Sequence, residues 1–134
     1  DQWKTILSNR NALFVSLQYG DVRNVVAEVS QLTGADILID EDVDPFSDFD
    51  AAAAQVAATD LVISTSNTAV HLAGALGKKV WLMVPAIPEW RWGLEGASVP
   101  WYPRLTLFRQ EKRGEWSPVL AQVSAALTNW ISGD

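Results

Sequence analysis

Residues 61–84, LVISTSNTAVHLAGALGKKVWLMV, hold two short apolar runs on either side of a helix-like segment. The runs at 61–63 and 80–84 are nearly all apolar, which is typical of strands that are covered on both faces. Between them, residues 68–76 have the pattern of a helix, and Gly77 is a residue type that commonly ends one. The segment therefore predicts a strand, a helix and a second strand, the unit from which parallel sheets are built.

The sequence on both sides repeats this alternation. Further strands are expected at 14–17, 37–39 and 105–108, and further helices at 22–32, after a capping box of Ser47 and Asp50, and at 117–131. Ser117 is expected as the N-cap of the last helix, with Pro118 at its first position. This order predicts an α/β fold, a three-layer Rossmann-like parallel sheet with helices on both faces. No linker or repeat interrupts residues 1–134, so we expect a single domain.

The first residues have the spacing of a helix. Trp3, Ile6 and Leu7 would share one helix face. A doubly wound domain ordinarily begins with its central strand. A helix ahead of the first strand is therefore an unusual order for this fold class.

Composition limits the classes of function. The 134 residues are 49% hydrophobic and 19% charged, which excludes a disordered chain. Because there is no cysteine, disulfide scaffolds and cysteine-held zinc or iron–sulfur sites are excluded, and the single histidine makes other metal sites less favoured. No apolar run approaches the roughly 18 residues of a membrane span, and no secretion signal is visible. The net charge of −6 argues against a positively charged surface for nucleic acid. From these exclusions together we expect a cytoplasmic domain.

The best candidate for a binding site follows the strand at 61–63. In open parallel sheets, ligands bind beyond the carboxyl ends of the strands. Ser66, Asn67 and Thr68 lead there directly into a helix, whose free backbone N–H groups and dipole favour a phosphate. The simpler interpretation is that Ser66 or Asn67 only caps the helix.

Two further side chains have both a binding and a structural interpretation. His71 falls one helical turn after Asn67 on the same face, so it is either a phosphate contact or a partly buried residue with one hydrogen-bond partner. Arg91 stands between Trp90 and Trp92, where it could bind phosphate or stack on a ring and hold the connection in place.

Tryptophan and acidic residues are each concentrated in one segment. Five of the seven tryptophans lie between residues 81 and 116: Trp81, Trp90, Trp92, Trp101 and Trp116. Such a cluster of large amphipathic rings predicts either a plug for the core or a wall of a ligand site. The acidic segment 40–50 lacks the spacing of a calcium loop, so no metal site is predicted. No nucleophile–base pair is recognisable, and the catalytic residues are left unassigned.

Several separated motifs suggest a more specific interpretation. DLVISTSNTAVHLAGALGKKVWLMVP at 60–85 is followed by PEWRWG at 88–93, PWYP at 100–103 and LFRQ at 107–110, and is preceded by FVSLQYGD at 14–21. Together they resemble a bacterial glycosyltransferase module of the kind found behind tetratricopeptide repeats. This module is similar to the heptosyltransferases and, more remotely, to O-GlcNAc transferases.

The resemblance implies the GT-B architecture, in which the active site lies between two Rossmann-like domains. This chain resembles the C-terminal domain, which binds a nucleotide-sugar donor. No metal or cofactor is expected, because the helix dipole, His71 and Arg91 can supply positive charge. Ser66 stands where the related enzymes have an aspartate, which puts a role for that acid in doubt. The donor diphosphate is expected in the turn 64–71, and the implied contacts are Ser66, Asn67, Thr68, Ala69, His71, Gln18 and Arg91.

The resemblance also implies a strand ahead of Trp3, at the centre of the sheet, and an acceptor domain that supplies the general base. The chain would then be a fragment, inactive alone. Its neighbouring strands would pair directly or borrow a strand from another copy of the chain, so a perturbed sheet or a dimer is expected. The alternative is a non-catalytic, degenerate Rossmann-like binding or interaction module. A flavodoxin-like or response-regulator domain would need a flavin loop or a phosphoacceptor after the first strand, and residues 18–20 offer neither.

Overall fold

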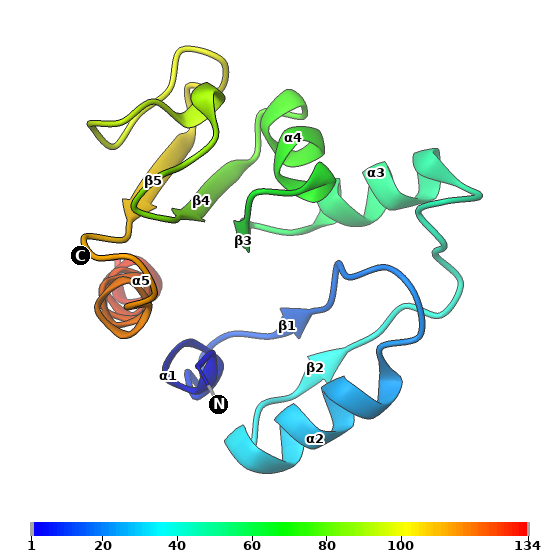
Figure 1. The fold of residues 1–134 in the computed structure, drawn as a ribbon. Coiled ribbons are helices and arrows are strands. Elements are labelled where there is room, and N and C mark those ends of the chain that lie inside the picture. The colour runs from blue at the N-terminus through cyan, green and yellow to red at the C-terminus, as the bar shows by residue number, and fades with distance from the viewer. Residues whose placement is uncertain (1, 134) are drawn as a thin grey trace.

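The computed structural model describes residues 2–133, in which helices and strands alternate (Figure 1). The α/β class is confirmed, since the strands are parallel and helices flank them. The strands are β1 (Phe14–Val15), β2 (Ile37–Leu38), β3 (Leu61–Thr65), β4 (Lys79–Val84) and β5 (Leu105–Arg109). The helices are α1 (Lys4–Leu7), α2 (Arg23–Thr33), α3 (Phe49–Ala58), α4 (Thr68–Ala75), the 3₁₀ turn η1 (Trp90–Trp92) and α5 (Ser117–Ser132).

The strands form two parallel sheets instead of one continuous sheet. β1 pairs with β2, with Phe14 opposite Ile37. β3, β4 and β5 form the second sheet, in which Val80 lies opposite Val62 on one side and Leu105 on the other. Within residues 2–133, no strand pairing joins β1 to β3, which face each other across the division (Figure 1). The sheet is therefore divided, and the first of the two expected alternatives, direct pairing of these two strands, does not occur.

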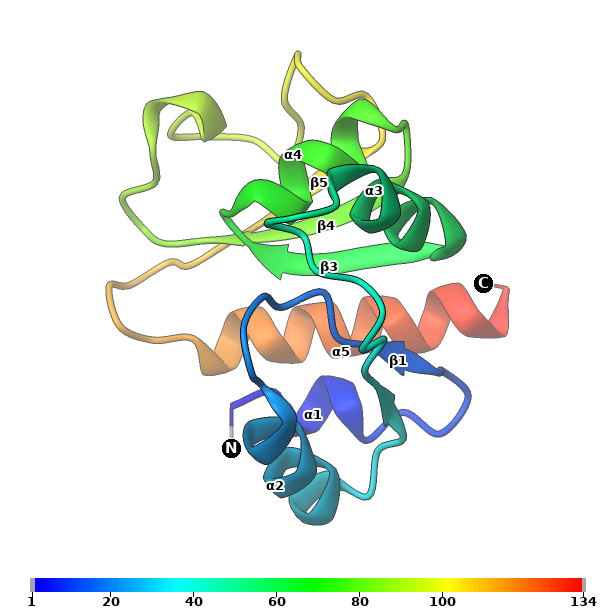
Figure 2. The same ribbon diagram turned by 90° about the vertical axis from the view of Figure 1, so that its right-hand side faces the viewer.

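Helices cover both faces of the larger sheet, as Figure 2 shows. Val80, Leu82 and Val84 belong to the apolar core beneath α3 and α4, whereas Trp81 and Met83 belong to the core against α1 and α5. All five side chains are at most 5% exposed. Burial on both faces explains why the sequence of β4 is nearly all apolar instead of alternating.

The start of α3 differs from the capping box that the sequence predicts. The N-cap is Asp48, whose carboxylate accepts the amide of Ala51 at 2.8 Å. The hydroxyl of Ser47 instead donates to the carboxylate of Asp44 at 2.7 Å. Aspartate is as good an N-cap as serine, so the helix starts one residue later once Ser47 belongs to the preceding turn.

The start of α5 also differs from the prediction, because the helix begins one residue earlier than expected. The carbonyl of Trp116 accepts the amide of Leu120 at 3.0 Å, which makes Trp116 the N-cap and places Ser117 inside the helix. Pro118 remains in the first turn, where its missing N–H costs no hydrogen bond. The prediction that Ser117 caps this helix is therefore wrong.

Arg109, at the end of β5, holds the long connection between β4 and β5. Its guanidinium donates to the carbonyl oxygens of Trp92, Gly93, Glu95 and Gly96 at distances of 2.6, 3.0, 3.1 and 2.6 Å. A guanidinium carries several donors in a rigid plane, so one side chain can satisfy a whole turn of backbone. This contact fixes the loop that buries Trp92 in the core.

Candidate functional site

The candidate site lies at the carboxyl ends of β1 and β3, where the strand order changes direction. From β1 the chain moves outward to β2, and from β3 it moves the opposite way to β4 and β5 (Figure 1). Open α/β sheets bind ligands at such switch points. Gln18 follows β1 and Ser66 follows β3, so the topology brings both to this edge.

The turn after β3 is organised by Asn67, which is the N-cap of α4. Its side-chain oxygen accepts the amide of Val70 at 3.2 Å, and its side-chain nitrogen donates to the hydroxyl of Ser64 at 2.8 Å. The amides of Thr68 and Ala69 donate to no acceptor within residues 2–133. The first turn of α4 therefore presents two free N–H groups at the positive end of the helix dipole.

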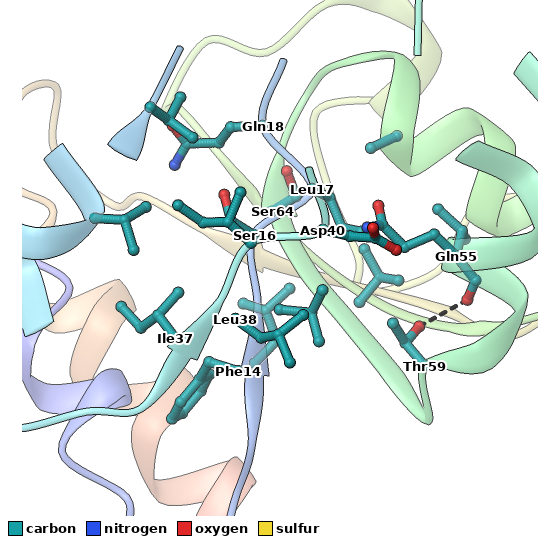
Figure 3. A pocket seen from close by; sticks show the side chains of 18 of the residues that line it. Phe14, Ser16, Leu17, Gln18, Ile37, Leu38, Asp40, Gln55, Thr59 and Ser64 are labelled. Carbon is teal, nitrogen blue, oxygen red and sulfur yellow. Dashed lines mark hydrogen bonds between the residues drawn. The ribbon is translucent and has the colours of Figure 1, made fainter. Parts of the chain in front are cut away.

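These donors border an open cleft of about 1930 Å³ between the two sheets. Asn67, Thr68 and Ala69 line the cleft from the side of α4, and Gln18 lines it from the side of β1. Figure 3 shows Gln18 and Ser64 among the side chains around it. Four of the expected contact residues thus lie along one cleft.

Ser66 lies beside this turn, but its hydroxyl is occupied by other side chains. It accepts the indole N–H of Trp92 at 3.0 Å and donates to the carboxylate of Glu89 at 3.4 Å. Ser66 therefore ties the turn after β3 to the tryptophan-rich connection. The capping role belongs to Asn67.

His71, in α4, packs against the same connection and does not line the cleft. Its Nδ1 lies 2.9 Å from the hydroxyl of Tyr102, and its ring stacks on Trp92 with centroids 5.3 Å apart. Of the two interpretations of His71, these contacts favour the structural one, a partly buried histidine with one hydrogen-bond partner.

Arg91 is also held by its neighbours. Its guanidinium pairs with the carboxylate of Glu89 at 2.6 Å and lies 5.1 Å from the centroid of the Trp90 ring. The indole of Trp101 donates to the carbonyl of Arg91 at 2.9 Å. To reach a phosphate in the cleft, Arg91 would have to leave Glu89, so the structure favours its role in holding the connection.

Tyr102 and Glu89 are contacts that the sequence analysis missed. Tyr102 joins His71, and Glu89 joins both Ser66 and Arg91. One signal in the sequence could have indicated a close neighbour of α4, although not which residue it is: Gly74 lies inside this helix, where glycine is unfavourable unless a neighbour needs the space. A Cβ at Gly74 would lie 2.5 Å from Cγ of the Tyr102 ring.

The arginine that lines the cleft is Arg23, which the sequence analysis also missed. Its guanidinium makes two hydrogen bonds of 2.9 Å to the carboxylate of Asp21 and approaches Glu41 at 4.0 Å. The side-chain hydrogen bonds from Arg23, then its backbone amide and its charge, lower the pKa of Asp21 to about 2. At neutral pH, Asp21 and Arg23 therefore form an ion pair at the edge of the cleft.

The effect of this pair is expected to appear at low pH. Because the pKa of Asp21 is lowered, the contact contributes stability above the ordinary aspartate pKa and loses it as the pH falls toward 2. In Arg23→Gln, we expect the carboxyl of Asp21 to titrate closer to an ordinary aspartate, as measured by the ¹³C shift of the carboxyl carbon. Arg104→Gln, which removes a distant charge, serves as the control. Equal titration of Asp21 in both variants would contradict the assignment.

Neither a metal site nor a membrane span is found in the part of the chain that is described. Within residues 2–133, no three histidine, aspartate or glutamate side chains come together as metal ligands would. No helix in this range has both the length and the apolar character needed to cross a membrane.

Comparison with curated proteins shows a similarity to one bacterial protein over nearly the whole chain. The chain is 37% identical over 130 residues to Protein FlbA of Caulobacter vibrioides. The match covers 97% of the chain but 22% of FlbA, so the chain spans about a fifth of the length of this relative. No protein-family model matches the chain, and no solved structure does.

Proposed function

We propose that this chain is the donor-binding half of a nucleotide-sugar-dependent glycosyltransferase. The observation that carries the proposal is the pair of free amides at Thr68 and Ala69, at the start of α4 and facing a cleft at the switch point. Together with the Asn67 cap, this is the arrangement that binds phosphate groups through backbone N–H donors and the helix dipole. The resemblance of the surrounding motifs to glycosyltransferases makes a nucleotide diphosphate sugar the proposed ligand.

The contribution of this half to the reaction would be electrostatic. As the sugar is transferred, negative charge develops on the leaving diphosphate. Preorganised N–H donors at that position stabilise the charge without having to reorient. Gln18 lines the opposite side of the cleft and is the proposed contact for the nucleotide or sugar. The acceptor and its general base would belong to the other domain, as the resemblance implies.

A competing proposal is a binding or interaction module whose donor site has decayed. It is favoured by the contacts of His71 and Arg91, since both side chains are occupied by Tyr102 and Glu89. The two proposals differ in whether a nucleotide binds at the start of α4.

Thermal unfolding with UDP, ADP, GDP and CMP, and with pyrophosphate as the control, separates them. At ten times its dissociation constant, a ligand adds about 1.4 kcal/mol, or roughly 3–6 °C for a domain of this size. We expect one nucleotide to raise the melting temperature more than pyrophosphate does. If nucleotide binding needs both proposed halves, the shift should appear when the same series is repeated on the two-domain enzyme that includes this chain. No shift in either protein would favour the decayed module.

Two substitutions at one position test the backbone contact. Thr68→Pro removes the amide of the first helical residue, where proline fits, and Asn67 before it is already extended, with φ −160° and ψ 179°. Thr68→Ala keeps the amide and removes only the side chain. We expect Thr68→Pro to weaken nucleotide binding by about tenfold, the effect of one charge-assisted hydrogen bond, and Thr68→Ala to bind normally. Equal affinities in titration calorimetry would reject the amide contact.

A further inference from the structure

The connection between β4 and β5 presents two tryptophan rings at the surface. Trp90 is 75% exposed and Trp101 is 54% exposed. Their ring centroids lie 6.3 Å apart and the ring planes meet at 81°, so the two indoles form a corner. Large apolar rings are ordinarily withdrawn from water, and a pair of them left exposed side by side indicates a surface that binds something.

Both rings are held in position by the protein itself. The indole N–H of Trp101 donates to the carbonyl of Arg91 at 2.9 Å, and the guanidinium of Arg91 lies 5.1 Å from the centroid of the Trp90 ring. Arg109 fixes the turn that follows through its hydrogen bonds to four carbonyl oxygens. A surface that is already ordered loses little conformational entropy when it binds a ligand.

Hydrogen-bond donors with unused capacity stand beside the rings. The carboxylate of Glu89 accepts from one amino group of Arg91 at 2.6 Å, and both side chains are about half exposed. The remaining N–H groups of this guanidinium, and the indole N–H of Trp90, donate to no acceptor within residues 2–133. The corner therefore combines apolar ring faces with charged and polar groups that are open to a ligand.

We propose that Trp90, Trp101 and the pair of Glu89 and Arg91 form a binding site for the pyranose ring of a carbohydrate. One face of a pyranose presents C–H groups, which pack on an indole ring. Its hydroxyl groups lie around the edge of the ring, where they pair with planar charged groups such as carboxylate and guanidinium. The inference goes beyond the proposed function, because it concerns neither the start of α4 nor a nucleotide.

Two other occupants fit these observations less well. A membrane surface is disfavoured by the net charge of −6, because the common charged headgroups are anionic and attract basic segments. A stable protein interface covers about 800 Å² on each partner, and charged residues are depleted at its centre. Here an ion pair adjoins the exposed rings instead. A protein partner would also be expected to use Leu94, an exposed apolar residue of the same connection.

An array of immobilised glycans, probed with the natural full-length protein, tests the proposal. The array contains hexoses, N-acetylhexosamines, deoxyhexoses and uronic acids in both anomeric linkages. We expect the protein to be retained by at least one of them. Titration calorimetry with the soluble form of a retained glycan then measures the affinity of each variant.

Trp90→Ala and Trp101→Ala should each weaken glycan binding by at least about tenfold, the usual effect of removing a central aromatic contact. Trp90→Phe keeps an aromatic ring and should retain part of the affinity. Leu94→Ser is the matched control, because it removes an exposed apolar side chain of the same connection and should leave the affinity unchanged. Circular dichroism checks that each variant is folded.

Four results would overturn the proposal. The first is retention by no glycan, and the second is equal affinity of the natural protein, Trp90→Ala and Trp101→Ala. The third is an equal loss in Leu94→Ser, or a dimer that Trp90→Ala dissociates in light scattering, because the rings would then belong to a protein interface. The fourth is loss of the nucleotide-induced thermal shift in Trp90→Ala together with glycan binding. An unchanged nucleotide shift in that variant separates this site from the start of α4.

Discussion

Trp92→Ala is expected to lower the free energy of unfolding by about 3–5 kcal/mol, the usual cost of removing a large buried aromatic side chain. Trp92 is 1% exposed and belongs to the core beneath α3 and α4. Its ring stacks on His71, and its indole N–H donates to Ser66 at 3.0 Å. The substitution removes apolar contacts, leaves a cavity and frees the hydroxyl of Ser66 from its donor. Urea unfolding followed by circular dichroism measures the change.

Trp90→Ala is the matched control, because Trp90 lies two residues away in the same 3₁₀ turn and is 75% exposed. Its loss is expected to change the unfolding free energy by no more than about 0.5 kcal/mol, as for most surface substitutions. Trp92→Phe keeps one apolar ring and removes the indole N–H together with the volume of the second ring, so its effect should fall between the two. Similar effects of Trp90→Ala and Trp92→Ala would show that Trp92 is not the core plug.

Of the two roles that the sequence left open for the tryptophan-rich connection, Trp92 takes that of the core plug. Trp92 fills the core, as a plug does, whereas Trp90 and Trp101 are 75% and 54% exposed. The rings of these two exposed residues meet edge to face with centroids 6.3 Å apart. Composition alone could not separate the roles, because both need large amphipathic rings. What decides between them is the contact of Trp92 with His71 and Ser66, from an element distant in the sequence.

Elements that depend on local pattern could be predicted from the sequence. The apolar run at 80–84 and the glycine after α4 identified the parallel unit, because burial on both faces and helix ends leave a local signature. The N-cap of α3 could not be predicted, since Ser47 and Asp48 are equally good caps. Their choice depends on Asp44, which draws the hydroxyl of Ser47 away.

The candidate site could be predicted only in part, for a similar reason. Asn67 and the first turn of α4 are local, so the sequence placed them correctly at the carboxyl end of β3. The contacts of His71 and Arg91 depend on Tyr102 and Glu89, and these come from the long connection. The connection has no repeating pattern of apolar residues, so the sequence does not show which of its residues will contact α4. These contacts can be identified only in the folded structure.

Gly74→Ala is expected to destabilise the protein by about 1–3 kcal/mol, although alanine ordinarily favours a helix over glycine by about 1 kcal/mol. Gly74 is buried within α4, and a Cβ there would lie 2.5 and 2.6 Å from Cγ and Cδ1 of Tyr102. The ring must move away, and its hydroxyl then loses Nδ1 of His71 at 2.9 Å. The steric term therefore outweighs the gain in helix propensity.

The sign of the effect should reverse when the ring is removed. In the background of Tyr102→Ala, the added methyl meets no ring, so Gly74→Ala should become neutral or stabilising by up to about 1 kcal/mol. Gly77→Ala is the control: a Cβ at Gly77 meets nothing within 4 Å, and the cost comes from its φ of +68°. That cost should be the same with and without Tyr102. If Gly74→Ala destabilised both backgrounds equally, the strain would lie in α4 itself, and the link between His71, Tyr102 and the connection would not depend on glycine.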